Sequence, residues 1–366
     1  MRLWPIDRVL VRPLGSTLHM PFHISHGSVE TLENVLIVLR DAEGRSAVGE
    51  AAPFPVLTGD TQQTVLPACQ QLADALVGLH PAAAMTRLHD ELWNDFAKTP
   101  TARAGVELAL WDLYARQLGV SLSSLWGRAA RLDAETDITL PRLSADEVLP
   151  FYRHFSSHRF PFVKVKVGGG ALSEDLDRVM ALVRCAGPSV RLSLDGNQGL
   201  CEQSAAMLCD ELSKWNVTPL FFEQPLPYDD IAGMARLSQR LRIPICADES
   251  VKTIFDAMTV MERRAAQMVN LKFMKSGVRE SLLIAELARR TQTALMIGGM
   301  VESEIAMTAS LHAVCGTGLI SVCDLDTPFF LRDRFTVDSP YHRSSAKLVL
   351  PSGTGLGLSL RDELLG

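Results

Sequence analysis

The chain has 366 residues, of which 47% are apolar and 21% charged, and its net charge is −6. This length suggests about two globular domains, and the negative charge argues against nucleic acid or an anionic membrane as a partner. No apolar run reaches the roughly 18 residues of a membrane helix. The N-terminus lacks the apolar core of a signal peptide, and the seven cysteines form no CxxC pair, so we expect a reducing, cytoplasmic setting.

The first third of the chain predicts an α+β module. Within it, ENVLIVLRDAEGRSAVGEAAPF has the pattern of strand, tight turn and strand. Residues from about 60 onward favour helices, and ARAGVELALWDLYARQLG places apolar residues at helical spacing before a closing glycine. We therefore expect a capping domain over residues 1–127, with residues 335–366 returning to pack on it.

Residues 128–334 have a different texture, with short apolar runs every 24 to 29 residues and helix-like sequence between them. The runs are TDITL, FVKVKV, RLSLD, PLFFE, IPICAD, MVNLK, ALMIGG and LISVCD. Eight strands alternating with helices predict an α/β fold of the TIM (β/α) barrel type. A doubly wound open sheet is the rival, but no GxGxxG follows the first strand, and polar residues end many strands rather than one pair.

Three acidic residues end three consecutive predicted strands: Asp195, Glu223 and Asp248. In a TIM barrel the active site lies at the carboxyl ends of the strands, and neighbouring strands are only about 5 Å apart. Three carboxylates converging there would repel one another unless a cation held them. Because the ligands are all oxygens, we expect one Mg²⁺ per subunit.

Lysines occupy the ends of two other strands. Lys164 and Lys166 share one face of their strand, which in a barrel is the interior, and Lys272 ends the strand four places further round. Lys166 and Lys272 would thus flank one carbon from opposite faces, so that one removes a proton and the other returns it. Such a base needs a lowered pKa, which we expect the ammonium of Lys164 to provide. Lys275 is interpreted as an ordinary loop residue.

These motifs resemble those of a known family. KVKVGGG, SLDGNQG, FFEQPLP, ADES and NLKFMKSG are similar to the strand-end motifs of the enolase superfamily, muconate-lactonizing-enzyme subgroup, and AGVELALWDLYARQLGVSLSSLWG is similar to the helix that leads into its barrel. The resemblance implies a modified barrel with a capping domain, Mg²⁺ on the three carboxylates, and an acid/base pair of Lys166 and Lys272. It implies Lys164 as a contact to the substrate carboxylate and Glu249 as a hydrogen-bond partner toward Lys272. We also expect supporting roles for Asn197 and Glu302, and substrate contacts from Thr139 and Gly298.

Within the subgroup, Asp324-Leu325-Asp326-Thr327-Pro328 resembles the Asp-x-Asp element of dipeptide epimerases such as L-Ala-D/L-Glu epimerase. Asp324 and Asp326 would then bind the ammonium of a dipeptide. His26 stands where a basic partner for a side-chain carboxylate is expected, although histidine is weaker than arginine in that role. The sequence therefore predicts a dipeptide epimerase.

Three activities of the same fold remain alternatives: N-acylamino acid racemase, o-succinylbenzoate synthase and muconate cycloisomerase. Their substrates carry no free ammonium, so Asp324 and Asp326 discriminate against them. A non-catalytic barrel is a further alternative, but a buried set of unused charges would be costly to keep. Since barrels with capping domains often assemble, we expect a homo-oligomer.

Overall fold

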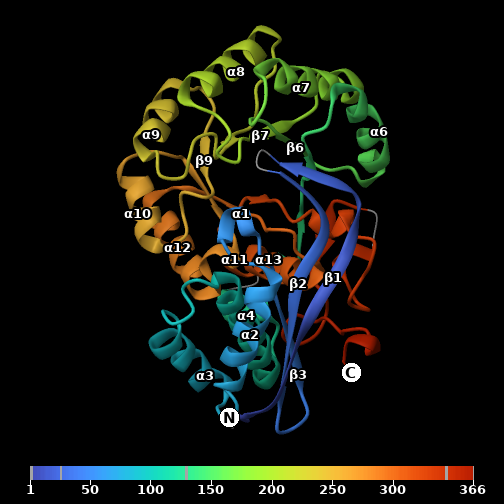
Figure 1. Cartoon of the computed structure of the whole chain (residues 1–366), viewed down its shortest axis with the longest axis vertical. Coiled ribbons are helices and arrows are strands. Elements are labelled where there is room, and N and C mark those ends of the chain that lie inside the picture. Colours follow the sequence, from blue (N-terminus) through green and yellow to red (C-terminus); the bar gives the residue numbers. More distant parts are fainter. Residues whose placement is uncertain (1–2, 25–26, 128–130, 343–344, 366) are drawn as a thin grey trace.

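The protein is described by a computed structural model that covers residues 3–24, 27–127, 131–342 and 345–365. Figure 1 shows two parts: a ring of helices around short strands, and a smaller part in which long strands lie beside helices. The long hairpin of the smaller part extends along one side of the ring and reaches its open end. Side chains from the smaller part can therefore cover the strand ends.

The smaller part begins with an antiparallel sheet of β1 (Ile6–Ile24), β2 (Gly27–Asp41) and β3 (Ser46–Ala51), in that order. One face of the sheet packs on helices, and the apolar residues Ile37 and Leu39 lie in the core that they share. The helical segments are α1 (Pro55–Thr58), α2 (Gln62–Asp74), α3 (Pro81–Arg87), η1 (Leu88–Leu92), α4 (Pro100–Leu118) and α5 (Leu122–Trp126). The predicted hairpin and helices are confirmed.

The larger part contains a curled sheet of eight parallel strands in the described chain, and neighbours along the sequence are neighbours in space. The strands are β5 (Ile138–Leu140), β6 (Val163–Lys166), β7 (Leu192–Asp195), β8 (Phe222–Glu223), β9 (Ile245–Ala247), β10 (Met268–Leu271), β11 (Ala294–Ile297) and β12 (Val322–Cys323). The two edge strands approach each other, since the Asp137 N–H donates to Cys323 O at 3.1 Å. The predicted barrel architecture is confirmed, and every expected apolar run contains its strand.

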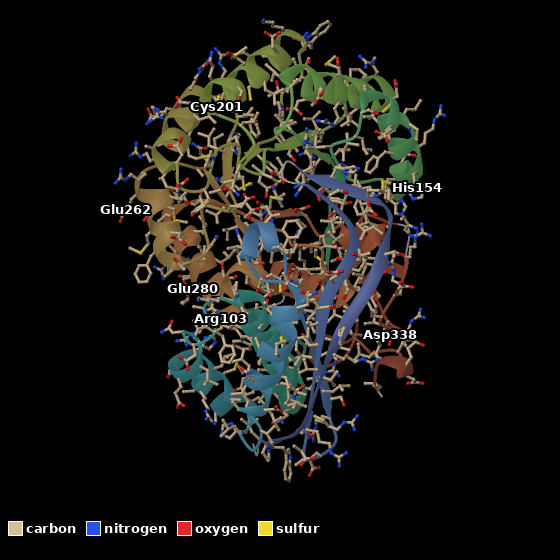
Figure 2. The ribbon with its side chains drawn as sticks, viewed as in Figure 1. Arg103, His154, Cys201, Glu262, Glu280 and Asp338 are labelled. Atoms are coloured by element: carbon tan, nitrogen blue, oxygen red, sulfur yellow. The ribbon has the colours of Figure 1, made fainter. Side chains whose placement is uncertain are left out.

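Helices cover the outside of this sheet (Figure 1). They are α6 (Ala145–Phe155), α7 (Leu172–Ala186), α8 (Glu202–Lys214), α9 (Ile231–Arg240), α10 (Ile254–Glu262), α11 (Phe273–Ser276), α12 (Val278–Thr291) and α13 (Glu304–Thr317). In Figure 2, His154 and Glu262 lie on helices at opposite sides of the ring. None of the helices in the described ranges is long and apolar enough to cross a membrane.

The inside of the barrel is apolar toward the amino ends of its strands. A buried cluster there is formed by Phe162, Phe221, Cys246, Met268 and Met296. This cluster fills the half of the barrel near the amino ends of the strands, as in other TIM barrels. Polar interior residues are consequently gathered toward the carboxyl ends.

The end of the chain contacts both parts. Strand β13 (Lys347–Val349) pairs with β4 (Asp133–Glu135), which precedes the barrel. The Gly355 N–H donates to Val120 O at 2.9 Å, and the Leu122 N–H donates to Gly355 O at 2.8 Å. The short 3₁₀ segments are η2 (Ser156–His158), η3 (Thr327–Phe330), η4 (Pro340–His342) and η5 (Asp362–Leu364). The boundary at residue 127 stays a prediction.

Candidate active site

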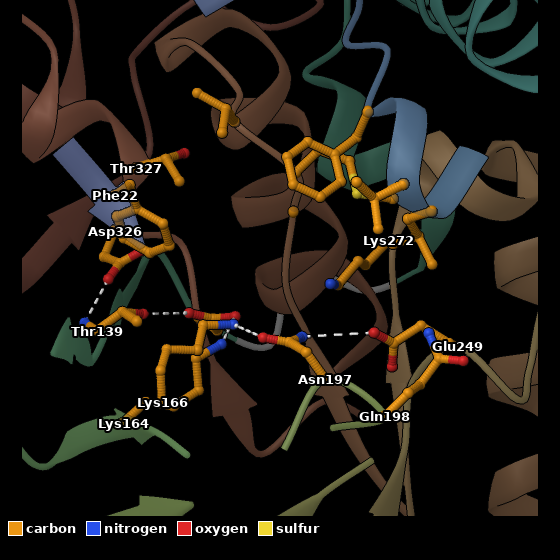
Figure 3. Close-up of a pocket in the computed structure, with 17 residues that line it drawn as sticks. Phe22, Thr139, Lys164, Lys166, Asn197, Gln198, Glu249, Lys272, Asp326 and Thr327 are labelled. Atoms are coloured by element: carbon orange, nitrogen blue, oxygen red, sulfur yellow. Dashed lines mark hydrogen bonds and ion pairs between the residues drawn. The ribbon is translucent and has the colours of Figure 1, made fainter. Parts of the chain in front are cut away.

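A cavity that is partly open to solvent lies at the carboxyl ends of the barrel strands. Both parts of the chain contribute to it. The capping part supplies Phe22, Phe54, Val56 and Leu57. The barrel supplies Thr139, Lys164, Lys166, Asn197, Gln198, Glu249, Lys272, Gly299, Met300, Val301, Asp324, Asp326 and Thr327. Figure 3 draws these side chains around the cavity, with the chain in front cut away.

The three expected metal ligands lie on adjacent strands. Asp195 ends β7, Glu223 ends β8 and is paired with Asp195 in the strand register, and Asp248 follows β9. All three are almost completely buried. Glu223 accepts a hydrogen bond from Asn270 Nδ2 at 2.5 Å through Oε1, whereas its Oε2 has no hydrogen-bond partner among the described residues. Such an orphaned, buried carboxylate oxygen suits a cation.

The two expected acid/base lysines stand on opposite sides of the cavity. Lys166 ends β6, and Lys272 follows β10, four strands further round the sheet. Figure 3 shows their ammonium groups separated by the open space of the cavity. Lys166 Nζ is 2.6 Å from Asp195 Oδ2, and Lys272 Nζ is 2.7 Å from Asp248 Oδ2. Each lysine is thus held beside one expected metal ligand.

The protein's own charges do not by themselves lower the pKa of Lys272. Burial alone would lower the pKa of Lys272, but the carboxylates of Asp248 and Glu223 outweigh burial and raise it. The repulsion from the Lys164 ammonium is a smaller effect. These carboxylates include two of the expected metal ligands, and a cation bound to them would oppose their effect on Lys272. The expected lowering of the pKa presupposes that cation, so it stays a prediction.

Lys164 connects the expected metal ligands to strand β12. Its ammonium pairs with Asp324 Oδ2 and lies 3.6 Å from Glu223 Oε2 and 3.8 Å from Asp195 Oδ2. Gly298 leaves room for this pair, since a Cβ there would lie 2.8 Å from Asp324 Oδ2. Glycine, which has no Cβ, is required here by this close approach rather than by an unusual backbone angle.

Thr139 binds Asp326, the second aspartate after β12. Its backbone N–H donates to Asp326 Oδ2 at 2.6 Å, and its hydroxyl lies 3.5 Å from Asp324 Oδ1. Burial, followed by repulsion from Asp324, raises the pKa of Asp326 to about 6. Figure 3 shows Thr139 and Asp326 across the cavity from Glu249 and Gln198.

The expected supporting residues have specific contacts. Asn197 accepts from Lys166 Nζ at 2.7 Å and donates to Glu249 Oε1 at 3.4 Å. Glu249 makes no hydrogen bond to Lys272 among the described residues, although the charge of Lys272 partly offsets the effect of burial on its pKa. Glu302 accepts from the Met300 N–H at 2.7 Å and so shapes the loop after β11. His26 lies outside the described residues.

Sequence reasoning missed two buried charges beside the site. Lys275, interpreted as a loop residue, donates to Asp248 Oδ1 at 2.6 Å, to Asp248 O at 2.6 Å and to Asn270 O at 2.9 Å. The signal was its position three residues after Lys272, in the one-turn helix α11 that turns its side chain back toward β9. Asp137 was missed because it precedes its strand, whereas the chemistry was expected at the carboxyl ends of the strands.

The acidic groups fit a divalent cation in chemistry, since their donors are all oxygens. Among the described residues, the acids whose oxygens lie within 4.8 Å of one another are Asp137, Asp324 and Asp326. The expected ligands Asp195, Glu223 and Asp248 do not form such a group. Lysine ammoniums stand against all three of them, so a bound cation would have to displace these contacts.

Comparison with known proteins identifies the family. Residues 6–127 match the mandelate racemase/muconate lactonizing enzyme N-terminal domain, and residues 151–364 match the enolase C-terminal domain-like family. The chain belongs to the enolase superfamily. Both matches lie on the parts described above, and the resemblance read from the strand-end motifs is confirmed.

Superfamily members similar to this chain are named dipeptide epimerases, which are isomerases. The hydrophobic dipeptide epimerase of Citrifermentans bemidjiense is 35% identical over 97% of each chain. The L-Ala-D/L-Glu epimerase of Bacillus subtilis is 30% identical over 96% of each chain, and its substrate-liganded structure has a TM-score of 0.92 over 97% of this chain and 98% of that one. A dipeptide epimerase of Enterococcus faecalis, solved with Mg and L-Leu-L-Tyr, is 26% identical, with a TM-score of 0.89 over 97% of this chain and 99% of that one.

Proposed function

We propose that this protein is a Mg²⁺-dependent epimerase that inverts the α-carbon of the C-terminal residue of a dipeptide. The observation that carries the proposal is the pair Lys166 and Lys272 on opposite sides of one cavity, with buried carboxylates between them. Inversion needs a proton donor and a proton acceptor on opposite faces of one carbon. Similarity to dipeptide epimerases over nearly the whole chain supports the same assignment.

The roles of the residues follow from their places. Asp195, Glu223 and Asp248 would hold the metal, which when bound would stabilise the negative charge that develops on the substrate carboxylate. Lys166 or Lys272, whichever faces the α-hydrogen, takes that proton at Nζ. The opposite lysine delivers a proton from its own Nζ to the other face. Burial of both side chains keeps bulk water away from the carbon.

The other end of the substrate would lie against β12. Asp324 and Asp326 line the cavity and are almost completely buried, so an ammonium placed beside them would be charge-paired in a desolvated site. The racemase, synthase and cycloisomerase alternatives have no ammonium for this place. A free dipeptide therefore fits the described acids better than an N-acylated amino acid.

The remaining lining favours apolar substrate side chains. Phe22, Phe54, Leu57, Met300 and Val301 line the cavity, and none of them carries a charge. A side-chain carboxylate would lose its hydration there without gaining a cationic partner from these residues. We therefore propose dipeptides with apolar side chains as preferred substrates.

The test is α-proton exchange followed by NMR in D₂O, with Mg²⁺ and a panel of dipeptides. We expect deuterium at the C-terminal residue's α-carbon, accumulation of the epimer, and loss of both with EDTA. Lys166→Ala and Lys272→Ala should each abolish epimerisation, and Lys166→Arg should also fail because arginine hardly deprotonates. Full activity after metal removal, or substantial epimerisation by either alanine variant, would contradict the proposal.

Two further expectations concern the whole protein. We propose that it forms a homo-oligomer and works in the cytoplasm with one Mg²⁺ per subunit. Light scattering of the purified protein measures the first, and metal analysis after dialysis measures the last. A monomeric mass across concentrations would contradict the oligomer, and a metal content other than one would contradict the stoichiometry.

A further inference from the structure

Asp137 is a buried acid that the proposed reaction does not use. It immediately precedes β5 and has no exposed surface, and neither of its carboxylate oxygens has a hydrogen-bond partner among the described residues. Burial, followed by repulsion from Asp324, raises the pKa of Asp137. A buried carboxyl without partners costs stability, so its presence beside the cavity calls for a ligand.

The neighbours of Asp137 are Asp324 and Asp326, the two acids that follow β12. One oxygen from each of Asp137, Asp324 and Asp326 lies within 4.8 Å of the other two. The Lys164 ammonium pairs with Asp324 Oδ2, and the Thr139 N–H binds Asp326 Oδ2. The other oxygen of Asp324 has a long contact with the Thr139 hydroxyl, at 3.5 Å, and can accept a further hydrogen bond. Lys164 is the only ammonium ion-paired with this group in the described chain.

Three oxygens that lie within 4.8 Å of one another can surround a primary ammonium. An –NH₃⁺ group has three N–H donors in tetrahedral directions. Hydrogen bonds of about 2.9 Å along these directions place the three acceptors about 4.7 Å apart. Three carboxylates can therefore each accept one N–H, whereas an N-acylated amine has a single donor and no charge.

We propose that Asp137 is the third carboxylate of the subsite for the free amino terminus of the substrate. The inference rests on the proposed function, since it takes the dipeptide to be oriented with its ammonium toward β12. Asp324 and Asp326 line the cavity, and Asp137 lies behind them, so the three together form a socket of acceptors. This socket selects a primary ammonium over a neutral amide.

The test compares binding by wild type and Asp137→Asn, with Mg²⁺ present. The ligands are one apolar dipeptide and its N-acetyl derivative, and calorimetry measures their Kd values. We expect Asp137→Asn to weaken binding of the free dipeptide by about tenfold or more, the effect of one hydrogen bond to a charged group. Binding of the N-acetyl derivative should change by less than about twofold. Equal losses for both ligands, or none for either, would overturn the proposal.

Ser193→Ala is the matched control. Ser193 is buried on β7, and its hydroxyl also lacks a hydrogen-bond partner among the described residues, but it does not belong to the acidic group. We expect its preference for the free dipeptide to equal that of wild type. If this variant lost the preference as strongly as Asp137→Asn, the effect would be one of barrel packing rather than of the carboxylate.

Stability supplies a second readout. A ligand-binding Asp137 contributes nothing favourable to the empty fold, so Asp137→Asn should unfold at the same or a higher temperature than wild type. A lower unfolding temperature together with unchanged ligand preference would show a structural role. Metal analysis tests whether the three acids bind a metal ion instead of an ammonium. A second Mg²⁺ per chain that is lost in Asp137→Asn would show such a cation site.

The same measurements separate this inference from the proposed function. Wild type that binds free dipeptides through Asp137 but exchanges no α-proton would retain the subsite and refute the epimerase. Wild type that epimerises dipeptides while Asp137→Asn keeps its full preference would retain the epimerase and refute the subsite. Wild type that binds neither ligand would overturn both.

Discussion

Replacing Lys275 with methionine tests whether this lysine holds Asp248 in place. Its ammonium is 2.6 Å from both Asp248 Oδ1 and Asp248 O and 2.9 Å from Asn270 O, so all three of its donors are used. Methionine keeps most of the length of the side chain but donates nothing. Lys275→Met therefore leaves one carboxylate oxygen and two buried carbonyl groups without this partner.

The expected loss of stability follows from the three contacts that Lys275 would lose. Removing one partner of a buried ion pair typically costs 3–5 kcal/mol. Because Asp248 keeps Lys272 at 2.7 Å, we expect the lower end of this range, about 3 kcal/mol. The assay is urea unfolding of the metal-free protein, with Lys214→Met as control. Lys214 forms an exposed pair with Glu211, so its replacement should cost about 0–1 kcal/mol.

The same variant should bind metal more weakly if Asp248 is a ligand. Residues that orient a ligand typically change metal affinity by about 10- to 100-fold when they are replaced. Calorimetric titration with Mg²⁺ measures this directly and does not depend on catalysis. Lys275→Met with the stability and Mg²⁺ affinity of wild type would refute the role assigned to this lysine.

Three other predictions concern separate parts of the molecule. Asp324→Asn should lower kcat/KM for a free dipeptide by about 30-fold or more, since truncating one partner of a desolvated charge pair costs about 2–5 kcal/mol. N-acetylation of the dipeptide should lower kcat/KM of wild type by a similar factor and that of the variant little further. An equal effect of N-acetylation on kcat/KM of the two proteins would contradict the ammonium contact. His312 is hydrogen-bonded to Leu356 O through Nε2. Burial lowers the pKa of His312 from 6.5 to about 4. The unfolded chain therefore binds a proton between these pH values that the folded chain does not, and stability falls by up to about 3 kcal/mol as pH drops from 6.5 to 4; urea unfolding across this range should show a smaller fall for His312→Gln, and parallel curves would contradict the assignment. Gly49→Ala should lower the unfolding temperature, because the added Cβ would collide with the carbonyl oxygen of Gly105 and overpacking costs about 1–3 kcal/mol; an unchanged calorimetric transition would show that β3 and α4 can separate.

The barrel was predictable because its strands are short, apolar and regularly spaced. Each strand packs a side chain toward the interior at every second residue, so Lys164 and Lys166 had to share one face. Their burial in the structure follows from this alternation alone. The cap was predictable for the same reason, since the hairpin turn and the helical spacing of α4 are local signals.

The contacts of the charged groups were not predictable from strand positions. Lys275 reaches Asp248 only because α11 makes a single turn directly after β10, and a one-turn helix leaves almost no periodic signal. Asp137 faces Asp324 and Asp326 because the first and last strands of the curled sheet meet, which is a property of closure.

The charges of the site agree with its proposed task. Apart from Glu302, whose pKa burial raises to about 8, seven buried carboxyls face four buried lysines around the cavity. The carboxyls are Asp137, Asp195, Glu223, Asp248, Glu249, Asp324 and Asp326, and the lysines are Lys164, Lys166, Lys272 and Lys275. If all were ionised, three negative charges would lack a counter-charge in a medium that screens weakly. A divalent cation and the ammonium of a dipeptide together carry three positive charges. A ligand that binds the folded chain alone stabilises it, by about 2.7 kcal/mol at a hundred times its Kd, so we expect these two cations to stabilise the fold.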